Sequence, residues 1–283
     1  MAVTGASGYL GSRICTTLES RGWDVVRLVR KPDPADRRSR HFDLAEEVPS
    51  ESLASVDLLI HAAYDQSLTR PVDIWRVNVE GTGRLLAGAR EAGVRRLIVL
   101  SSMSAYEGTT QLYGRAKLEI EQLASQFGGC SIRPGLVYAK ESRGMMAALN
   151  RIAGMRIVPV PSGNPRQFPV HEDDLMAVIA KLSEIDPLPS TPIGVAQADP
   201  VALPDLLRVL AARQGRSSRF VTIPWQALYS VLRVAEFARL PMPFRADSLL
   251  GLVRPARGVP NSEFLPALGI SLRGFEHSVA DGS

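Results

Sequence analysis

The chain has 283 residues, of which 45% are hydrophobic, enough for one large core and a smaller second lobe. Its 33 Lys and Arg residues outnumber 29 Asp and Glu residues and are scattered along the chain, which favours an anionic small molecule over nucleic acid as ligand. No apolar run is long enough to span a bilayer, and the first expected strand starts at residue 2, which leaves no room for a targeting segment. We therefore expect a cytoplasmic protein.

The two cysteines, Cys15 and Cys130, each lie in an apolar stretch. They have neither the spacing of metal ligands nor that of a disulfide framework, which suits a reducing compartment. We expect both to be core residues, and we expect no metal site.

The first expected elements are a strand and a helix. Only three residues, "MAV", precede a glycine-rich turn, whereas a mean strand has about five or six residues. Leu10, Ile14 and Leu18 then recur at a spacing of four and stop before Gly22. This spacing predicts a helix that ends near that glycine.

Apolar runs and helical patterns alternate through the first half. Runs nearly continuous in Val, Ile and Leu predict buried strands at residues 25–29, 56–63, 95–102 and 130–138, and helical faces are expected over residues 74–85 and 116–127. Such alternation implies parallel strands with right-handed crossovers, hence an α/β fold with a doubly wound parallel sheet of the Rossmann type. A closed eight-fold barrel is disfavoured because only about six such units are present.

Proline becomes frequent after residue 140, and the regular alternation ends. Isolated helices are expected near residues 173–182, 203–214 and 225–240. This half is expected to form a smaller lobe that faces the substrate.

A glycine-rich stretch, "VTGASGYLG", places Gly5, Gly8 and Gly11 at intervals of three between a strand and a helix. A turn without side chains lets the backbone approach a pyrophosphate, and the helix start offers free N–H groups and a positive dipole end. Glycines also serve ordinary turns, but this context favours a dinucleotide site. The expected contacts are Gly5, Ala6, Ser7, Gly8, Tyr9, Leu10 and Gly11.

A second group of polar residues follows the strand expected at 95–102. Ser102 ends that strand, and Tyr113 and Lys117 lie four residues apart on the next helix, hence on one face. A phenol titrates near ~10, so proton exchange near neutrality needs a cation such as the Lys117 ammonium beside it. Ser102 is placed to hold a substrate oxygen next to the phenol. Taken singly, such residues are also common on solvated helices and at helix caps.

Together with "HAA" at residues 61–63, "NVEGT" at 78–82, "RPG" at 133–135 and "VHEDD" at 170–174, these motifs resemble the extended short-chain dehydrogenase/reductase superfamily, most closely its epimerase/dehydratase branch. The resemblance covers about residues 2–182. It implies an NAD(P)-binding Rossmann domain over residues 1–140, to which residues 166–183 return. A substrate-binding lobe would comprise residues 141–165 and 184–283.

The resemblance also implies roles for single residues. Ser102, Tyr113 and Lys117 would be catalytic, and Asn78 would support the polar network of the active site. His171 and Asp173 match a motif that mainly anchors the substrate lobe. Besides the glycine turn, Tyr113 and Lys117, the implied cofactor contacts are Asp43 and Leu44 at the adenine, Ala62 and Ala63 at the ribose, and Pro134 and Gly135 behind the nicotinamide.

Two departures from the family pattern narrow the reaction. Family dehydratases commonly carry an Asp-Glu pair after the catalytic Ser or Thr, whereas this chain has Met103 and Ser104. Without those carboxylates, elimination of water lacks its acid and base. Only ten residues separate Ser102 from Tyr113, which disfavours a full-size nucleotide sugar.

The stretch "LVRKPDP" bears on the choice of cofactor. Val29 stands where an acidic residue would bind both ribose hydroxyls, and Arg30 and Lys31 follow it. A carboxylate repels a 2′-phosphate, whereas a guanidinium binds it, so NADP is favoured over NAD. Arg13, Arg37 and Arg38 are candidates for further contacts. The alternative is a solvated basic loop, with NAD as the cofactor.

These observations favour an NADP(H)-dependent oxidoreductase that interconverts a secondary alcohol and a ketone on a sugar-derived or similar small polar substrate. One alternative is an NAD-dependent nucleotide-sugar epimerase, which uses the same three catalytic residues. Another is a non-catalytic dinucleotide sensor. The expected partner is a small-molecule substrate, and we expect binding neither to nucleic acid nor to a membrane. A homodimer is possible.

Overall fold

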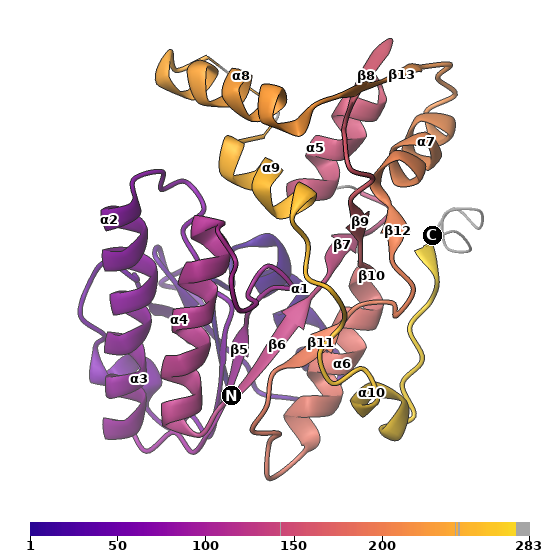
Figure 1. Ribbon diagram of the computed structural model, residues 1–283. Coiled ribbons are helices and arrows are strands. Elements are labelled where there is room, and N and C mark those ends of the chain that lie inside the picture. Colours follow the sequence, from indigo (N-terminus) through magenta and orange to yellow (C-terminus); the bar gives the residue numbers. More distant parts are fainter. Residues whose placement is uncertain (142, 241, 243, 276–283) are drawn as a thin grey trace.

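Seven parallel strands form a central sheet in the order β11-β6-β5-β4-β1-β2-β3. Figure 1 labels β5, β6 and β11 of this sheet. This computed structural model describes residues 1–141, 143–240, 242 and 244–275. In chain order, the strands of the sheet are β1 (Ala2–Thr4), β2 (Val26–Val29), β3 (Ser39–His41), β4 (Leu58–His61), β5 (Arg96–Leu100), β6 (Cys130–Pro134) and β11 (Ile193–Val195).

Helices cover both faces of the sheet because alternate residues of each strand point to opposite sides. Leu58 and Ile60 of β4 pack with α1 (Tyr9–Ser20) and α6 (Glu172–Glu184), whereas Leu59 packs with α3 (Gly81–Glu91) and α4 (Leu112–Phe127). The short α2 (Pro71–Ile74) and the π-helical segment η2 (Trp75–Glu80) precede α3. The structure thus confirms the predicted doubly wound sheet.

The first strand is as short as expected. All three residues of β1 are buried, and Ala2 pairs with Val26 on one side and with Leu59 on the other. A central strand of three residues is stable here because strands flank it on both sides. It ends one residue before Gly5, at the carboxyl edge of the sheet.

The run at residues 130–138 was expected as one strand, and the structure shows two. Gly135 separates β6 from β7 (Leu136–Tyr138), which leaves the central sheet and pairs with β10 (Pro169–His171). A Cβ atom at Gly135 would overlap the carbonyl oxygen of Phe168 and lie 2.8 Å from the Cβ atom of Ala196. The absence of a side chain therefore allows the chain to change its partner strand there.

Part of the region assigned from sequence to the substrate lobe lies in the Rossmann domain instead. Strand β11 extends the central sheet beside β6, and Leu265 of α10 (Phe264–Ala267) packs into the same core. The short run around Ile193 carries too few apolar residues to reveal a strand, and its partner lies about sixty residues earlier in the chain.

The second lobe lies beyond the carboxyl ends of the central strands, at the top of Figure 1. Its own core includes Met146, Leu149, Leu206 and Leu210. The region expected as this lobe also includes residues 142, 241, 243 and 276–283, which lie outside the described residues. Its elements are α5 (Gly144–Ala153), β8 (Ile157–Pro161), β9 (Arg166–Gln167), β12 (Val201–Ala202), α7 (Leu203–Arg213), β13 (Arg219–Ile223), α8 (Trp225–Phe237) and α9 (Ala246–Val253).

Cys15 and Cys130 are buried free thiols, which confirms their prediction as core residues. Among the described helices, none combines the length and apolar character needed to cross a membrane.

The contact between α1 and the glycine turn generates a prediction about stability. A Cβ atom at Gly11 would overlap the carbonyl oxygen of Gly5 and lie 2.7 Å from its carbonyl carbon, so the backbone would have to move. Gly11→Ala should therefore lower the free energy of unfolding by about 1–3 kcal/mol. Gly83 is the control, because a Cβ atom there meets nothing within 4 Å on α3. Gly83→Ala should stabilise by up to about 1 kcal/mol.

Urea unfolding of the two variants tests this prediction. If Gly11→Ala were as stable as the wild type, the turn would be free to move and the close approach would not constrain the fold.

Candidate active site

The residues predicted for the site gather at one edge of the sheet. Parallel strands end at a common carboxyl edge, and open α/β sheets bind ligands there, where the strand order reverses between β1 and β4. Six of the predicted positions follow six strands of the sheet in this way: Gly5, Arg30, Asp43, Ala62, Ser102 and Gly135.

The glycine turn forms a cradle of backbone at the start of α1. Gly5 has a positive φ of 66°, and a Cβ atom there would lie 2.9 Å from the Cα atom of Ala63. Gly8 donates its N–H to the Gly5 carbonyl at 2.8 Å, and no side chain caps α1 at Gly8. The first N–H groups of α1 are thus left to bind an anion, as the pyrophosphate of a dinucleotide requires.

The side chains within this turn point to different surroundings. Ala6 is buried, Ser7 is exposed, and Leu10 packs against the core. The Tyr9 hydroxyl donates to the Glu172 carboxylate at 2.7 Å. The turn therefore offers mainly its backbone to a ligand.

Arg13 is not placed as a phosphate contact, contrary to the expectation from sequence. Its guanidinium binds the Asp173 carboxylate at 2.8 Å and lies 3.7 Å from Glu172, because α6 packs against α1 and brings its acidic first turn to this side chain. His171 accepts the Asp173 N–H at 3.2 Å, and its ring packs against Tyr138 with 5.1 Å between centroids. These contacts serve packing of α6.

The basic residues after β2 differ from Arg13 in their lack of acidic partners among the described residues. Arg30 and Lys31 are exposed, and among the described residues neither side chain has an ion-pair partner. Their neighbour Arg27 binds Glu19 and Asp36 instead. Two cations are therefore free to bind an added anion at the carboxyl end of β2. Arg37 and Arg38 are likewise exposed.

Hydrogen bonds hold the backbone at the residues that the sequence led us to expect at the adenine and the ribose. The Asp43 carboxylate accepts the N–H of Ala45 at 2.9 Å, and the Leu44 carbonyl accepts a hydrogen bond from Arg84 at 2.8 Å. The N–H groups of Ala62 and Ala63 both donate to the Thr4 hydroxyl at 3.1 Å. The Thr4 bonds hold the loop after β4 beside the glycine turn, and the Arg84 bond holds the loop after β3 to α3.

Tyr113 lies in the first turn of α4, opposite Ser102. Burial raises the pKa of Tyr113 to about 12, and a hydrogen bond with the Ser102 hydroxyl opposes this rise. The Ser102 hydroxyl oxygen also accepts the N–H of Ser104 at 3.1 Å. The phenol therefore carries its proton at neutral pH.

Lys117 lies one turn further along α4, on the same face. Its ammonium donates to the Leu100 carbonyl at 2.7 Å, and the Nζ atom lies 5.9 Å from the centroid of the Tyr113 ring. Burial lowers the pKa of Lys117 to about 8, and the Glu121 carboxylate opposes this change. The expected lowering of the phenol pKa by Lys117 is not seen: burial raises the pKa of Tyr113, and the opposing contribution comes from the Ser102 hydrogen bond.

A buried ion pair under the site was not predicted from sequence. Glu121, one turn after Lys117, accepts two hydrogen bonds from Arg133 at 2.7 and 2.8 Å and one from the Ser101 hydroxyl. These bonds join α4 to the ends of β5 and β6. The spacing of Lys117 and Glu121 on one helix was the available signal, but Arg133, the partner of Glu121, comes from strand β6.

Tyr64 contacts both Tyr113 and Lys117, and Asn78 holds the loop that carries Tyr64. The Tyr64 ring packs edge-on against Tyr113, with 5.0 Å between centroids, and lies 4.7 Å from Lys117 Nζ. Asn78, in the π-helical segment η2, accepts the Asp65 N–H at 2.7 Å and donates to its carbonyl. Asn78 therefore fixes the loop that carries Tyr64, and it has no hydrogen bond to Tyr113 or Lys117 within the described residues.

Pro134 and Gly135 lie at the end of β6. Met103 donates its N–H to the Pro134 carbonyl at 3.0 Å, and Gly135 donates to the Val195 carbonyl at 3.0 Å. The loop after β5, β6 and β11 are thereby held together behind Ser102.

Asp247 connects the second lobe to the helix of Tyr113. Its two carboxylate oxygens accept the N–H groups of Leu112 and Tyr113 at 2.8 and 3.3 Å and so cap the start of α4. In the same lobe, Arg245 donates to the Leu68 carbonyl at 2.9 Å, and the Arg254 carbonyl accepts the hydroxyl of Tyr106. Sequence reasoning missed Asp247 because the cap lies 135 residues from the helix start.

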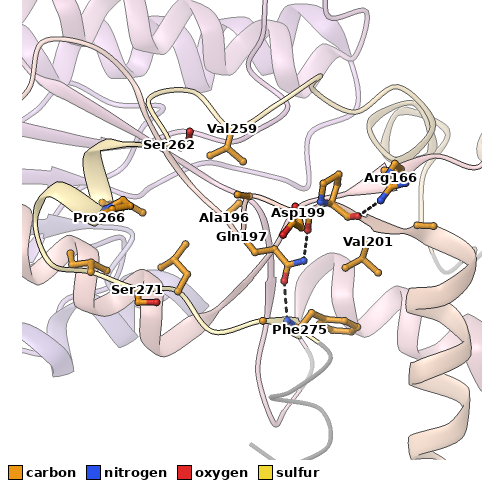
Figure 2. A pocket seen from close by; sticks show the side chains of 18 of the residues that line it. Arg166, Ala196, Gln197, Asp199, Val201, Val259, Ser262, Pro266, Ser271 and Phe275 are labelled. Atoms are coloured by element: carbon orange, nitrogen blue, oxygen red, sulfur yellow. Dashed lines mark hydrogen bonds between the residues drawn. The ribbon is translucent and has the colours of Figure 1, made fainter.

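A cavity of about 880 Å³ lies between the segment after β11 and the C-terminal segment (Figure 2). The Gln197 side chain crosses it, donating to the Asp199 carbonyl at 2.5 Å and accepting the Phe275 N–H at 2.9 Å. None of the predicted site residues lines this cavity. The candidate active site is therefore the carboxyl edge of the sheet.

The fold and the arrangement at this edge define an NAD(P)-dependent enzyme of the extended short-chain dehydrogenase/reductase type. The chain belongs to the NAD dependent epimerase/dehydratase family, whose model matches residues 1–186. This result confirms the resemblance seen in the sequence motifs.

Individual relatives are distant but extend over most of the chain. A ceramide reductase from Caulobacter vibrioides is 24% identical and covers 99% of this chain and 93% of its own. A 4-hydroxy-2-methyl-3-oxo-4-farnesyl-3,4-dihydroquinoline-1-oxide ketoreductase from Stigmatella aurantiaca is 25% identical, with 83% and 79% covered. The solved structure of MoeE5 in complex with UDP-glucose and NAD has a TM-score of 0.74 at 22% identity over 99% and 95% of the chains, which shows a shared fold.

The cap formed by Asp247 generates a second prediction. Asp247→Ala should lower the free energy of unfolding by about 0.5–2 kcal/mol, because two N–H groups of α4 lose their acceptor. Asp205→Ala is the control, since this aspartate in the first turn of α7 forms an exposed ion pair with Arg208. The control should change stability by less than about 0.5 kcal/mol. Chemical denaturation measures both, and equal losses would contradict the capping role.

Proposed function

We propose that the protein is an NADP(H)-dependent oxidoreductase that interconverts a secondary alcohol and a ketone. The observation that carries this proposal is the half-buried phenol of Tyr113, placed against the Ser102 hydroxyl with the buried Lys117 cation 5.9 Å from the centroid of its ring. A phenol in its acid form is suited to give a proton to the oxygen of a ketone.

Each residue has one task in the reductive direction. The Tyr113 hydroxyl transfers its proton to the carbonyl oxygen of the substrate, and Ser102 donates a hydrogen bond to that oxygen. The Lys117 ammonium stabilises the phenolate that remains. The nicotinamide ring of the bound dinucleotide supplies the hydride for the carbonyl carbon.

The chain offers groups that fit a dinucleotide. The uncapped start of α1 and the glycine cradle would hold the pyrophosphate, and Tyr113 and Lys117 would contact the nicotinamide ribose. Asp43 and Leu44 would contact the adenine, Ala62 and Ala63 the ribose beside it, and Pro134 and Gly135 the nicotinamide ring.

Dehydration is disfavoured by the residues that follow Ser102. Met103 is buried against Phe168 and Ala196, and Ser104 donates its N–H to Ser102. Neither residue carries a carboxylate for elimination of water.

The choice of NADP rests on Arg30 and Lys31. Both cations lie at the carboxyl end of β2 without an ion-pair partner among the described residues, and Val29 supplies no carboxylate to repel a 2′-phosphate. A charge-assisted hydrogen bond from a guanidinium is the usual way to hold such a phosphate.

An NAD-dependent nucleotide-sugar epimerase is the second candidate. It is favoured by the family match and by the likeness to MoeE5, whose structure contains UDP-glucose and NAD. The two relatives named as reductases favour the first candidate. Purified protein distinguishes them, because a reductase consumes added NADPH, whereas an epimerase shows no net turnover of the dinucleotide.

Tyr113→Phe tests the catalytic assignment. The substitution removes the exchangeable proton but keeps the ring, so NADPH-dependent turnover should fall by about 10²–10⁴-fold while dinucleotide binding is nearly unchanged. Tyr64→Phe is the matched control, because Tyr64 packs against the same side chains without an assigned proton transfer. Steady-state kinetics and a binding titration provide the two measurements. A loss of only a few-fold in Tyr113→Phe would remove it from its role.

Arg30→Ala tests the cofactor preference. Removing the guanidinium should weaken NADPH binding by about 1.5–3 kcal/mol, the worth of a hydrogen bond to a charged group, and leave NADH binding nearly unchanged. Arg95→Ala is the control, because it removes an equal charge beside Asp57, at the opposite edge of the sheet. Both dissociation constants are measured by nicotinamide fluorescence at fixed ionic strength. Equal wild-type affinities that Arg30→Ala leaves unchanged would place the NAD-dependent epimerase first.

A further inference from the structure

Helix α8 exposes an apolar face that nothing in the described chain covers. Phe237 is 92% exposed, Val234 67% and Val231 59%, and these three residues lie on one side of the helix at a spacing of three. Leu240 and Met242, just after the helix, are 59% and 41% exposed. We call these five residues the α8 patch. Single exposed apolar residues are common, but such clusters mark interaction sites.

The opposite side of α8 is already occupied. Leu228 and Leu232 pack with Ala246 and Leu249 of α9. Because this packing fixes the helix, the α8 patch is held on the outside. Figure 1 shows α8 at the outer edge of the second lobe, away from the central sheet.

Exposed apolar side chains are concentrated in this lobe. Eight large hydrophobic residues of the described chain are exposed, and one of them, Val72, belongs to the Rossmann domain. The other seven lie in the second lobe: Met155, Ile157, Val231, Val234, Phe237, Leu240 and Met242.

Positive charge is concentrated in the same part of the chain. Residues 203–257 contain nine arginines, no lysine and three carboxylates, an excess of six positive charges, whereas the whole chain has a formal charge of +4. Arg233 and Arg239 are exposed next to the α8 patch, and Arg233 lies 3.6 Å from the Glu236 carboxylate. Apolar side chains flanked by arginines fit an anionic lipid surface, which offers acyl chains and phosphate groups together.

We propose that the α8 patch docks the second lobe onto the surface of an anionic lipid bilayer. The helix has 13 residues, fewer than the roughly 20 needed to span a bilayer, so it lies in the plane of the interface. The sequence led us to expect no membrane partner because no apolar run is long enough to span, and docking at the surface needs no such run.

A second copy of this chain fits the patch less well. Two such faces in contact would bring Arg233 and Arg239 near their own copies, and like charges across an interface are repulsive. A stable interface also buries about 800 Å² on each partner, more than five side chains on one short helix provide.

A chain of contacts connects the docking helix to the candidate active site. The α8 helix packs on α9, and α9 carries Asp247, which caps the helix of Tyr113. The proposal itself does not depend on the reaction proposed above, because the patch shares no residue with the catalytic site.

Sedimentation of the full chain with vesicles tests the proposal. The wild type should sediment with vesicles of phosphatidylcholine and phosphatidylglycerol in roughly a 2:1 ratio, and at least about tenfold less with phosphatidylcholine alone. Raising NaCl from about 0.1 M to about 1 M should reduce binding several-fold, since charges are then screened.

The decisive comparison is between two exposed apolar sites. The double variant V234S/F237S should lose about tenfold or more in binding to the anionic vesicles, whereas Val72→Ser, at an exposed site on the Rossmann domain, should bind like the wild type. A second double variant, R233Q/R239Q, removes charge without touching the apolar side chains and should lower binding several-fold. Circular dichroism shows whether V234S/F237S folds. If it does not, R233Q/R239Q still tests the proposal.

Three outcomes would overturn the proposal. The first is that the wild type does not sediment with anionic vesicles. The second is that the wild type and the folded patch variants bind these vesicles equally. The third is that the wild type binds no vesicles and forms a dimer in light scattering, which V234S/F237S converts to a monomer. NADPH titration without vesicles should give the same affinity for the wild type and V234S/F237S. A failure of docking is thus distinguishable from a failure of the proposed reaction.

Discussion

The buried ammonium of Lys117 is the constraint around which the active site is arranged. Removing a cation from water costs several kcal/mol unless polar groups replace its hydration. The Leu100 carbonyl, 2.7 Å away, accepts one hydrogen bond, and the Tyr64 ring offers its electron-rich face at 4.7 Å. Glu121 supplies the opposing charge one turn along α4. Burial still prevails, since the pKa of Lys117 falls to about 8.

This cation also affects the side chains around it. Burial, together with the charge of Lys117, lowers the pKa of His61 to about 3, so its imidazole stays neutral between the hydroxyls of Thr4 and Thr82 at 2.8 and 3.0 Å. Tyr113 is half-buried against Ser102, and its pKa is raised to about 12. His61 is neutral and the Tyr113 phenol keeps its proton. The charged group near the phenol is therefore the Lys117 ammonium, 5.9 Å from the centroid of its ring.

The second lobe is part of this arrangement. The Asp247 carboxylate accepts hydrogen bonds from two N–H groups at the start of α4. Arg245 holds the loop after β4 by donating to the Leu68 carbonyl. Both residues belong to the α9 region, which packs on α8. The second lobe therefore also sets the position of Tyr113 at the start of α4.

The sequence by itself determined the parallel sheet, the glycine turn and the identity of Ser102, Tyr113 and Lys117 as site candidates, because these depend on local periodicity and on spacing within one element. Only the tertiary structure decided the partners of residues far apart in the chain. Arg13 pairs with Asp173, β11 joins β6, and a C-terminal aspartate caps α4. It also decided the direction in which the pKa of Tyr113 shifts, since burial is a property of packing and no sequence spacing reports how far a side chain lies from water.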